Sequence, residues 1–385
     1  MMPTLEYDES SCPNIGSLGF NKFCKRSLQL HEAPVLKTLI IKLNQRKSLK
    51  LPSSFPSTFF RKIVVLKVHK ITPYFADSQP STVCFQSLKS LHLTSVIFNG
   101  EEPFCRLISA CPVLEDLFLN SVTSSFKFFA PSLFTISVPS LQRLEIKEKD
   151  NTPMVCSTCP RYDSRFTINT PSLKYFNLSI QDFVGRFELE DMPNLVEARL
   201  GVDPYKTYNF LKLSLSSVQI LSVHICATEV LLLAEKISQR LLHLELYIYG
   251  KILRNLLLHL LKHAPKLQFL KVRETHMTMT WPIYPDTLAR VREFNDPLPS
   301  IATPSSVPEC VSFHLKTFHW FGYEGRDEEK EIVLYILQNA QCLKTAVISV
   351  FATGSPGGEK ELLMIKELES MPKISTFCKL IVRHR

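Results

Sequence analysis

Hydrophobic residues recur along this chain in an eight-residue pattern: proline, any residue, leucine, two of any kind, leucine, any residue, then leucine or isoleucine. Two clear copies span residues 112–119 and 139–146, and a copy without the proline runs from Phe85 to Leu93. Looser copies begin at Pro34, Pro171, Pro193 and Pro265. The first apolar position of each copy falls at Leu36, Ile63, Leu88, Leu114, Leu141, Leu173, Leu195, Val218, Leu241 and Leu267.

These positions follow one another at intervals of 22 to 32 residues. A leucine pattern with that period is typical of leucine-rich repeats, in which each repeat forms a short strand and a return segment. Because one repeat cannot bury its apolar side alone, repeats are stable only as a stack. The sequence therefore predicts an α/β leucine-rich-repeat solenoid, with a curved parallel sheet on its concave face and helices and loops on its convex face.

Side chains of a strand alternate between two faces, so every second residue of each predicted strand points into the solenoid. In the second clear copy, Leu144 and Ile146 are expected inside. Arg143, Glu145 and Lys147 are expected on the concave surface. The same alternation assigns one exposed row of side chains to every repeat.

The return segments differ along the chain. Residues 103–110 and 252–263 have helical periodicity and then a proline, which ends a helix. Residues 121–138 lack this periodicity, and we expect irregular loops there. After residue 306 the pattern predicts helices over 327–339 and 359–370, alternating with further strands.

Composition fits a folded protein of a reducing compartment. Hydrophobic residues make up 45% of the 385 residues, and the eleven cysteines are irregularly spaced and odd in number, which excludes a disulfide framework. The first residues are acidic and polar rather than those of a secretory signal, so we expect the cytoplasm or nucleus. The net charge of +9 comes from scattered lysines and arginines, which makes nucleic acid an unfavoured partner.

No local motif assembles a catalytic or metal-binding set. Cys156 and Cys159 have the spacing of half a zinc site, but no second pair follows at finger spacing. His259 and His263 share one side of a predicted helix without a neighbouring glutamate. We therefore predict that the chain is not an enzyme and holds no metal or cofactor.

Aromatic and cationic side chains on predicted concave positions are the candidate binding residues, because core packing does not require them there. Aromatic residues and arginine are enriched at the energetic centres of protein interfaces. The predicted partner-binding residues are Phe118, Tyr175, Arg199, Tyr247, Phe269, Lys271 and Arg273.

The C-terminal part of the chain resembles the plant FBD domain. The resemblance rests on the stretch from Ser306 to Phe318, on Trp320-Phe-Gly-Tyr-Glu-Gly, on Glu328-Glu-Lys-Glu and on the ending from Met371 to Leu380. Upstream, Ala110-Cys-Pro-Val-Leu-Glu-Asp-Leu resembles the leucine-rich region of plant F-box/FBD/leucine-rich-repeat proteins. The resemblance covers essentially the whole chain.

The resemblance implies a division into four parts. They are an N-terminal tail at 1–25 as a remnant of the F-box junction, leucine-rich repeats at 26–274, a proline-rich connecting loop at 275–305 and an FBD domain at 306–385. We expect the N-terminal F-box itself to be absent. Such proteins are substrate-recognition subunits of SCF-type ubiquitin ligases, whose F-box docks on a Skp-type adaptor and, through it, on a cullin.

Three hypotheses follow. The chain is the target-binding portion of a ubiquitin ligase adaptor, with Skp-type adaptor and cullin as partners only if an F-box is supplied. Alternatively, it is a free-standing scaffold that binds a target protein without ubiquitination. The third possibility is a receptor that holds a small molecule on the concave surface.

Overall fold

The structure is a computed structural model that describes most of the chain. The described ranges are 4–12, 17–30, 36–49, 61–73, 85–98, 102–124, 133–147, 165–180, 186–202, 215–249, 252–275, 306–351 and 358–383. The chain divides into two compact units, Met1–Asn194 and Leu195–Arg385.

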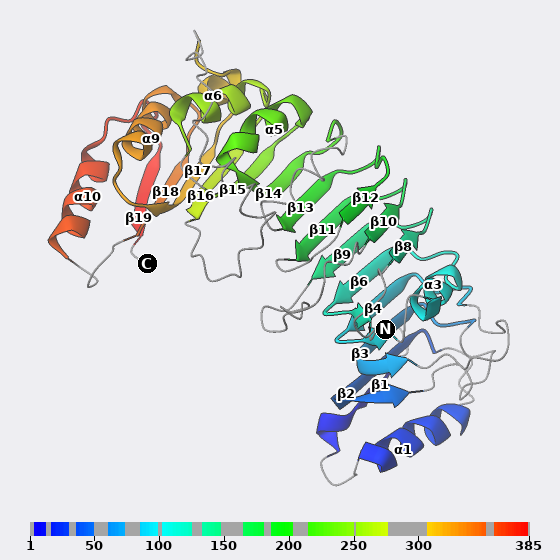
Figure 1. Cartoon of the computed structure of the whole chain (residues 1–385). Coiled ribbons are helices and arrows are strands. Elements are labelled where there is room, and N and C mark those ends of the chain that lie inside the picture. The colour runs from blue at the N-terminus through cyan, green and yellow to red at the C-terminus, as the bar shows by residue number, and fades with distance from the viewer. Residues whose placement is uncertain are drawn as a thin grey trace, which may run out of the picture. The chain divides into compact units, whose positions relative to one another are not determined.

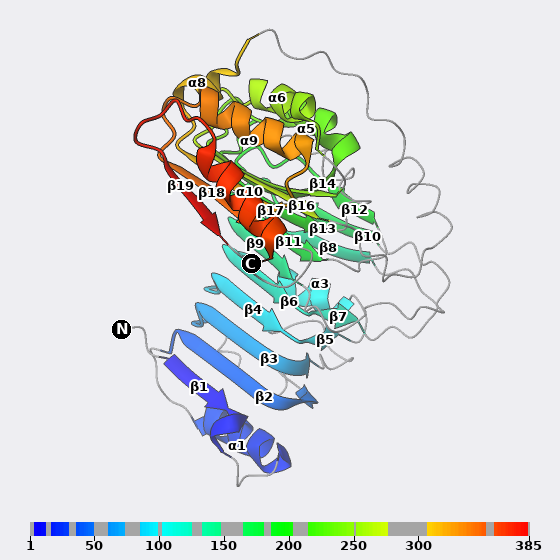
Figure 2. The same ribbon diagram turned by 90° about the vertical axis from the view of Figure 1, so that its left-hand side faces the viewer.

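The first unit is built on a parallel sheet in the order β1-β2-β3-β4-β6-β9-β11 (Figure 2). Its strands are β1 (Thr4–Asp8), β2 (Thr38–Leu49), β3 (Val65–Pro73), β4 (Ser90–Thr94), β6 (Asp116–Asn120), β9 (Arg143–Lys147) and β11 (Tyr175–Ile180). Its described return segments contain the helices α1 (Ser17–Leu30) and α3 (Glu102–Ser109) and several short strands. These strands are the pair β5 (Ile97–Phe98) and β7 (Thr123–Ser124), and the three-stranded sheet of β8 (Leu133–Ser137), β10 (Arg165–Asn169) and β12 (Arg186–Leu189).

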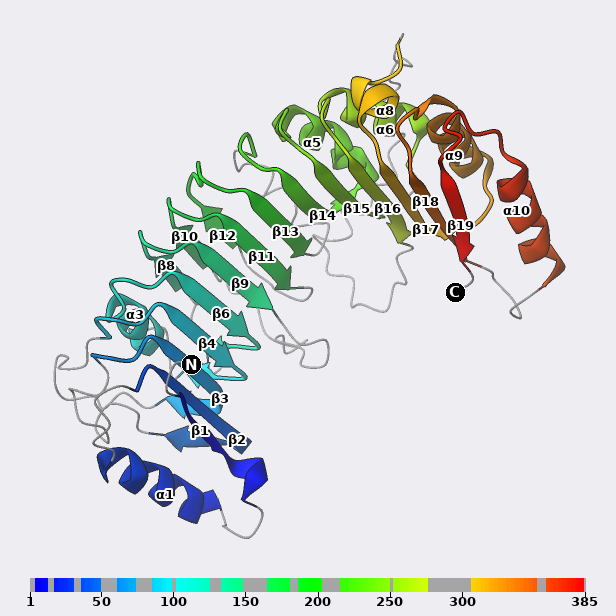
Figure 3. The ribbon, with the colours of Figure 1, turned by 180° about the vertical axis from the view of Figure 1, so that it is seen from behind.

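The second unit continues the same strand geometry in the order β13-β14-β15-β16-β17-β18-β19, with helices on one face of the sheet (Figures 1 and 3). Its strands are β13 (Glu197–Val202), β14 (Ile220–Cys226), β15 (His243–Tyr249), β16 (Phe269–Thr275), β17 (Thr317–Tyr323), β18 (Thr345–Val350) and β19 (Lys379–Arg383). Its helices are η3 (Ala227–Glu229), α5 (Val230–Lys236), α6 (Arg254–Lys262), α8 (Glu309–Phe313), α9 (Asp327–Asn339) and α10 (Glu359–Ser370). We call the other side of this sheet its helix-free face.

The predicted fold class is confirmed, and the repeat pattern marks the core. All ten first apolar positions are buried, from Leu36 at 5% exposure to Leu267 at 0%. Most of these strands begin with the same backbone contact to the preceding repeat. For example, the amide of Gln142 donates to the carbonyl of Glu115 at 2.8 Å, and that of Leu242 donates to Gln219 at 2.9 Å.

Some return segments could be predicted from the local sequence pattern, and others could not. The helices predicted at 103–110, 252–263, 327–339 and 359–370 are found as α3 (Glu102–Ser109), α6, α9 and α10. The expectation of irregular loops over 121–138 was wrong in part. Strands β7 and β8 lie there, because partner strands from other repeats complete their hydrogen bonds.

The segment 1–25, for which the sequence indicated only a tail, contains ordered elements. Strand β1 pairs in parallel with β2, and η1 (Glu9–Ser11) and α1 (Ser17–Leu30) follow it. The Tyr7 hydroxyl donates to Ser27 Oγ at 2.8 Å, which fixes the helix against the strand. Most of the predicted connecting loop, residues 276–305, lies outside the described residues, and the domain boundaries remain predictions.

None of the helices in the described ranges is long and apolar enough to cross a membrane.

Candidate recognition surface on strands β14 to β17

Half-buried polar and aromatic side chains gather on the helix-free face of the second unit. Strand alternation separates them from the core: Leu244 and Leu246 of β15 are fully buried, while the residues between and beside them face outward. We call the outward set the β14–β17 cluster. It comprises His224, His243, Glu245, Tyr247, Phe269, Lys271, Arg273, His319 and Phe321.

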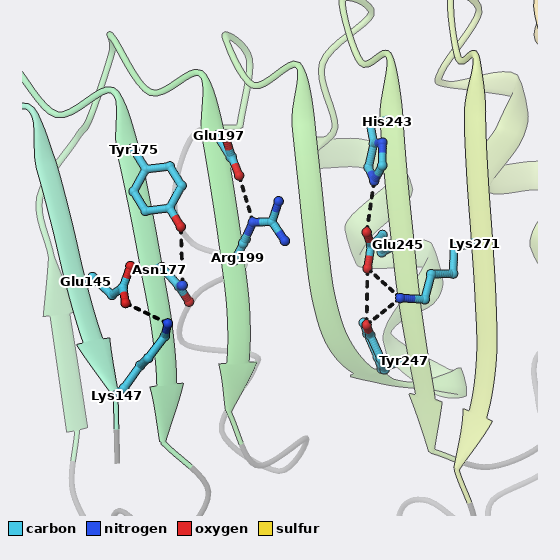
Figure 4. Close-up of polar contacts among 10 residues, drawn as sticks. All are labelled: Glu145, Lys147, Tyr175, Asn177, Glu197, Arg199, His243, Glu245, Tyr247 and Lys271. Atoms are coloured by element: carbon cyan, nitrogen blue, oxygen red, sulfur yellow. Dashed lines mark hydrogen bonds and ion pairs between the residues drawn. The ribbon is translucent and has the colours of Figure 1, made fainter. Parts of the chain in front are cut away.

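Glu245 is the centre of a hydrogen-bonded network in this cluster (Figure 4). Its carboxylate accepts hydrogen bonds from His243 Nε2 at 3.0 Å, from the Tyr247 hydroxyl at 3.1 Å and from Lys271 Nζ at 2.9 Å. Lys271 Nζ also donates to the Tyr247 hydroxyl at 2.8 Å. The network joins two neighbouring strands and leaves no charge on Glu245 unpaired.

Aromatic rings extend the cluster to both sides. His243 stacks on Phe269 with centroids 4.0 Å apart, and the edge of His319 meets the Phe269 ring at 5.1 Å. On the other side, His224 stacks on Tyr247 at 4.5 Å. Stacked rings hold each other in place, so the surface is ordered before any partner arrives.

The electrostatics of the cluster follow from these contacts. The hydrogen bond from His243, with those from Lys271 and Tyr247, lowers the pKa of Glu245 to about 2. Burial, with the nearby charges of Arg273 and Lys271, lowers the pKa of His224 to about 4. Burial alone would lower the pKa of Lys271, but its bonds to Tyr247 and Glu245 raise it above its ordinary value. At neutral pH this surface therefore carries a carboxylate, two cations and an uncharged His224.

Arg273 is the cation of the cluster that takes no part in the Glu245 network. The strand register places it between Tyr247 of β15 and Phe321 of β17 on the same face. Within the described residues, no carboxylate forms an ion pair with it. The rings of Tyr247 and Phe321 lie next to the Lys271 ammonium, 5.0 and 5.4 Å from their centres. The Arg273 guanidinium can therefore receive a carboxylate of a partner in a charge-assisted pair.

The other predicted binding residues lie apart from this cluster. In the first unit, Phe118 stacks on His92 at 4.1 Å, and the Arg143 guanidinium lies 4.1 Å from the centre of the Tyr175 ring. In the second unit, Arg199 of β13 donates to Glu197 at 2.7 Å (Figure 4). Each of these contacts joins residues of one strand or of two adjacent strands. The structure thus brings together Tyr247, Phe269, Lys271 and Arg273 from the predicted set, and it leaves Phe118, Tyr175 and Arg199 separate.

Sequence reasoning omitted five members of the cluster from the predicted binding residues. His243 and Glu245 were assigned to the exposed face, but their role was missed because a histidine and a glutamate look like ordinary surface residues. His224, His319 and Phe321 were missed as well. Aligning the repeats on their first buried leucine places all five in three rows, and that alignment was the available signal.

The candidate chemical motifs gain no support. Cys156 and Cys159 lie outside the described residues. His259 and His263 lie 5.0 Å apart on α6, and the ring of His263 contacts the His259 carbonyl at 3.0 Å. Within the described ranges, no three histidine, cysteine, aspartate or glutamate residues are grouped as metal ligands.

The stretch that resembles an FBD domain builds interior structure. Trp320 is fully buried on β17, and a bulge at Gly322, whose φ is +83°, turns Tyr323 to the same side. The buried Glu329 accepts hydrogen bonds from the amides of Glu324 and Arg326, both at 2.9 Å, which fixes the start of α9.

Arg326 links this stretch to the last strand before it. Its guanidinium bonds to Glu329 at 2.9 Å and to the buried Glu274 of β16. Glu274 also accepts the amide of Ile252 at 3.1 Å, at the beginning of the α6 repeat. The motif residues therefore attach the C-terminal repeats to those before them.

Comparison with known proteins identifies the class and then the family. The FBD family matches residues 303–348, and the Leucine Rich Repeat family matches residues 87–112. The fold and these matches define a leucine-rich-repeat protein with an FBD region.

Three relatives from Arabidopsis thaliana match almost the entire chain. A putative F-box/FBD/LRR-repeat protein is 45% identical, over 100% of this chain and 88% of the relative. A putative FBD-associated F-box protein is 40% identical, over 100% and 86%. An F-box/FBD/LRR-repeat protein is 33% identical, over 99% and 90%. This chain belongs to the F-box/FBD/LRR-repeat protein family.

Proposed function

We propose that this chain is a non-enzymatic recognition module, and that the β14–β17 cluster is where it contacts a target protein. The observation that carries the proposal is the accumulation of four aromatic or cationic residues, Tyr247, Phe269, Lys271 and Arg273, on a face where the core does not need them. Such residues dominate the binding energy of protein interfaces.

The arrangement favours a target with an acidic group beside apolar surface. Arg273 supplies a cation without a paired carboxylate in the described part of the chain, and Tyr247 and Phe321 flank it. Phe269, which lies two rows from Arg273 along β16, adds an apolar ring that contacts His319 edge to face. Because Glu245 already holds Lys271 in position, little side-chain freedom is lost when the target binds.

The test is site-specific photo-crosslinking from plant cells. A photoreactive phenylalanine analogue in place of Phe321, which is in register with Arg273, should crosslink to a target, and the same analogue at the exposed Glu235 of α5, on the helix-bearing side, should not. Tyr247→Ala and Phe269→Ala should each reduce the crosslink at least about tenfold, as expected for interface hot spots, with melting temperature retained. Equal crosslinking from positions 321 and 235, or no effect of both substitutions, would overturn the assignment.

We further propose that the module serves an SCF-type ubiquitin ligase, in the cytoplasm or nucleus, when an F-box is present. The names of the relatives, which include the F-box, support this proposal. Co-purification of this chain with Skp-type adaptor and cullin, with and without an added F-box segment, tests it. Assembly with the F-box segment supports the ligase role. Failure in both forms would support the alternative of a free-standing binding scaffold.

A further inference from the structure

Strand β19 leaves one of its edges open. Among the described strands it pairs with β18 alone, so its outer edge has no neighbour. The amide of Lys379 donates to the Lys344 carbonyl at 2.9 Å. Because successive backbone groups of a strand point to opposite sides, the amides and carbonyls of Leu380 and Val382 point away from β18. This edge offers hydrogen-bonding groups to an added strand.

The apolar side of β19 is also incompletely covered. Leu380 and Val382 lie in register with Ala346 and Ile348 of β18, which are both fully buried. Leu380 and Val382 themselves are partly exposed, although α10 packs on β18 and β19. Among the described residues, the apolar layer of the second unit therefore ends at β19 with side chains that are only partly covered.

Exposed hydrophobic residues lie on the helix that packs on β19 and on the segment that leads into it. Leu363 of α10 is 60% exposed and Phe377, two residues before β19, is 89% exposed. The connection that carries Phe377 is anchored: the Ile374 amide donates to the Leu337 carbonyl at 3.0 Å, and the Ser375 hydroxyl donates to the Leu343 carbonyl at 2.8 Å. An anchored segment that presents a phenylalanine outward is suited to contact a partner.

Charge indicates which partner fits. Lys379 and Arg383 lie on the helix-free face of β19, on either side of Ile381. Their register partners on β18 are Thr345 and Ser349, so neither cation faces an acid across the strands. In the described ranges, no carboxylate forms an ion pair with either one.

We propose that β19 receives an extended acidic segment of another protein, which pairs with the outer edge as an added strand. Its acidic residues would face Lys379 and Arg383 on the helix-free face. Its apolar residues would cover Leu380 and Val382 on the other. Backbone hydrogen bonds supply affinity in this mode, and alternating side chains supply specificity. This site is separate from the β14–β17 cluster and does not depend on the proposed function.

A second copy of this chain fits the same edge poorly. Two β19 strands paired antiparallel around Ile381 would place Lys379 opposite Arg383, and like charges directly opposite each other destabilise a strand pair. We therefore assign the edge to a different protein.

The test uses a fluorescent, end-blocked seven-residue peptide of alternating glutamate and valine, titrated with the full chain and followed by fluorescence anisotropy. The peptide should bind, and the same peptide with lysine in place of glutamate should not. The double variant Lys379→Glu/Arg383→Glu should bind the acidic peptide at least about tenfold more weakly, because opposite-charge pairs across strands become like-charge pairs. The matched control Lys236→Glu/Lys262→Glu, which changes two exposed lysines on helices, should bind as the original chain does.

A second variant tests the strand pairing itself. Val382→Pro removes an outward amide without removing a bond to β18, so it should reduce peptide binding about tenfold. Circular dichroism melts would verify that each variant is folded. If the acidic peptide does not bind, or binds equally to the double variant, the proposal is wrong. Concentration-dependent dimerisation that Val382→Pro abolishes would assign the edge to a second copy and overturn the proposed partner.

Discussion

The two units of this chain have strands with the same pattern of buried residues, but they differ in their return segments and in the side chains that they expose. In the first unit the described returns contain short strands as well as helices, and exposed side chains make contacts between neighbouring strands, such as His92 with Phe118. In the second unit the described returns contain helices, and the exposed side chains form one connected cluster around Glu245.

The difference teaches that the repeat core and the binding surface are set independently. Leu144 in the first unit and Leu244 in the second are both fully buried at equivalent positions. The residues that follow them, Glu145 and Glu245, have one ion-pair partner and three hydrogen-bond donors, respectively. Glutamate at equivalent repeat positions therefore forms a single ion pair in one unit and is the centre of an ordered network in the other.

The largest expected effect comes from the buried charges of the second unit. Arg326→Met leaves Glu274 and Glu329 buried without their cation, which should lower the free energy of unfolding by about 3–5 kcal/mol. Urea unfolding followed by tryptophan fluorescence measures it, since Trp320 lies in the core of this unit. The control Lys330→Met breaks a partly exposed pair with Glu367 in the same unit and should change stability by less than about 1 kcal/mol.

The Arg326→Met loss should depend on pH. Burial raises the pKa of Glu274, so its protonated form is favoured in the folded state. The variant should therefore regain stability as the pH falls from 7 to 5 and lose it again as the pH rises. A loss that is the same at both pH values would contradict this account.

The second-largest expected effect distinguishes Glu245 from Glu145. Glu245→Gln should destabilise by about 1–3 kcal/mol at pH 7, because three donors lose a charged acceptor. Glu145→Gln should destabilise by less than about 1 kcal/mol, because Lys147 is its only ion-pair partner in the described residues. Hydrogen–deuterium exchange of β15 and β9 compares them.

The contribution of Glu245 to stability should also depend on pH. The pKa of Glu245 is lowered to about 2, so its stabilising contribution is present at neutral pH and is lost as the pH falls from about 4 towards 2. The difference between the original chain and Glu245→Gln should shrink over that range. Equal losses for the two glutamates at pH 7 would remove the contrast between the units.

A smaller effect concerns the stacked histidines. Phe118→Ala should cost about 0.5–1.5 kcal/mol beyond lost burial, because it removes a stacked ring from His92. Burial, with the nearby Lys67, lowers the pKa of His92 to about 4, so the original chain loses stability as the pH falls from 6.5 to 4. Phe118→Ala should raise the pKa of His92 and make this loss of stability smaller. An NMR titration of His92 would measure the change.

Tyr247→Ala provides the counterpart in the second unit. The pKa of His224 should rise less than that of His92, because Arg273 and Lys271 still disfavour its protonation. A larger rise for His224 than for His92 would show that stacking outweighs the neighbouring charges.

The smallest stability effect is expected where the chain is most exposed. Phe377→Ser should change the free energy of unfolding by less than about 0.5 kcal/mol, because the side chain is 89% exposed. It should still weaken binding of the acidic peptide to β19. A marked loss of stability would mean that Phe377 belongs to the fold and not to a docking site.

The sequence predicted the repeat positions and several returns because local patterns determine them. The ten buried positions from Leu36 to Leu267 follow from a period that is visible in the chain alone. The helices α9 and α10 were predictable within their bounds, because apolar periodicity and acidic first-turn residues identify them.

Local patterns gave no indication of elements that depend on distant partners. Strand β8 exists because β10 pairs with it about 30 residues later, and a five-residue strand has little propensity signal of its own. The β14–β17 cluster was predictable in part: Tyr247, Phe269, Lys271 and Arg273 were identified as exposed. Their connection through Glu245 and three histidines required the register of four strands.

The sequence by itself determined the class of fold, because the spacing of leucines specifies which side chains are buried and how often the chain returns. Only the tertiary structure decided which exposed residues act together, because a side chain's partners on the sheet come from strands more than twenty residues away. It also decided that the conspicuous motif residues Trp320, Tyr323 and Glu329 lie inside, where they attach the last repeats. Burial follows from a periodic pattern, whereas a charge's partner depends on how separate repeats align.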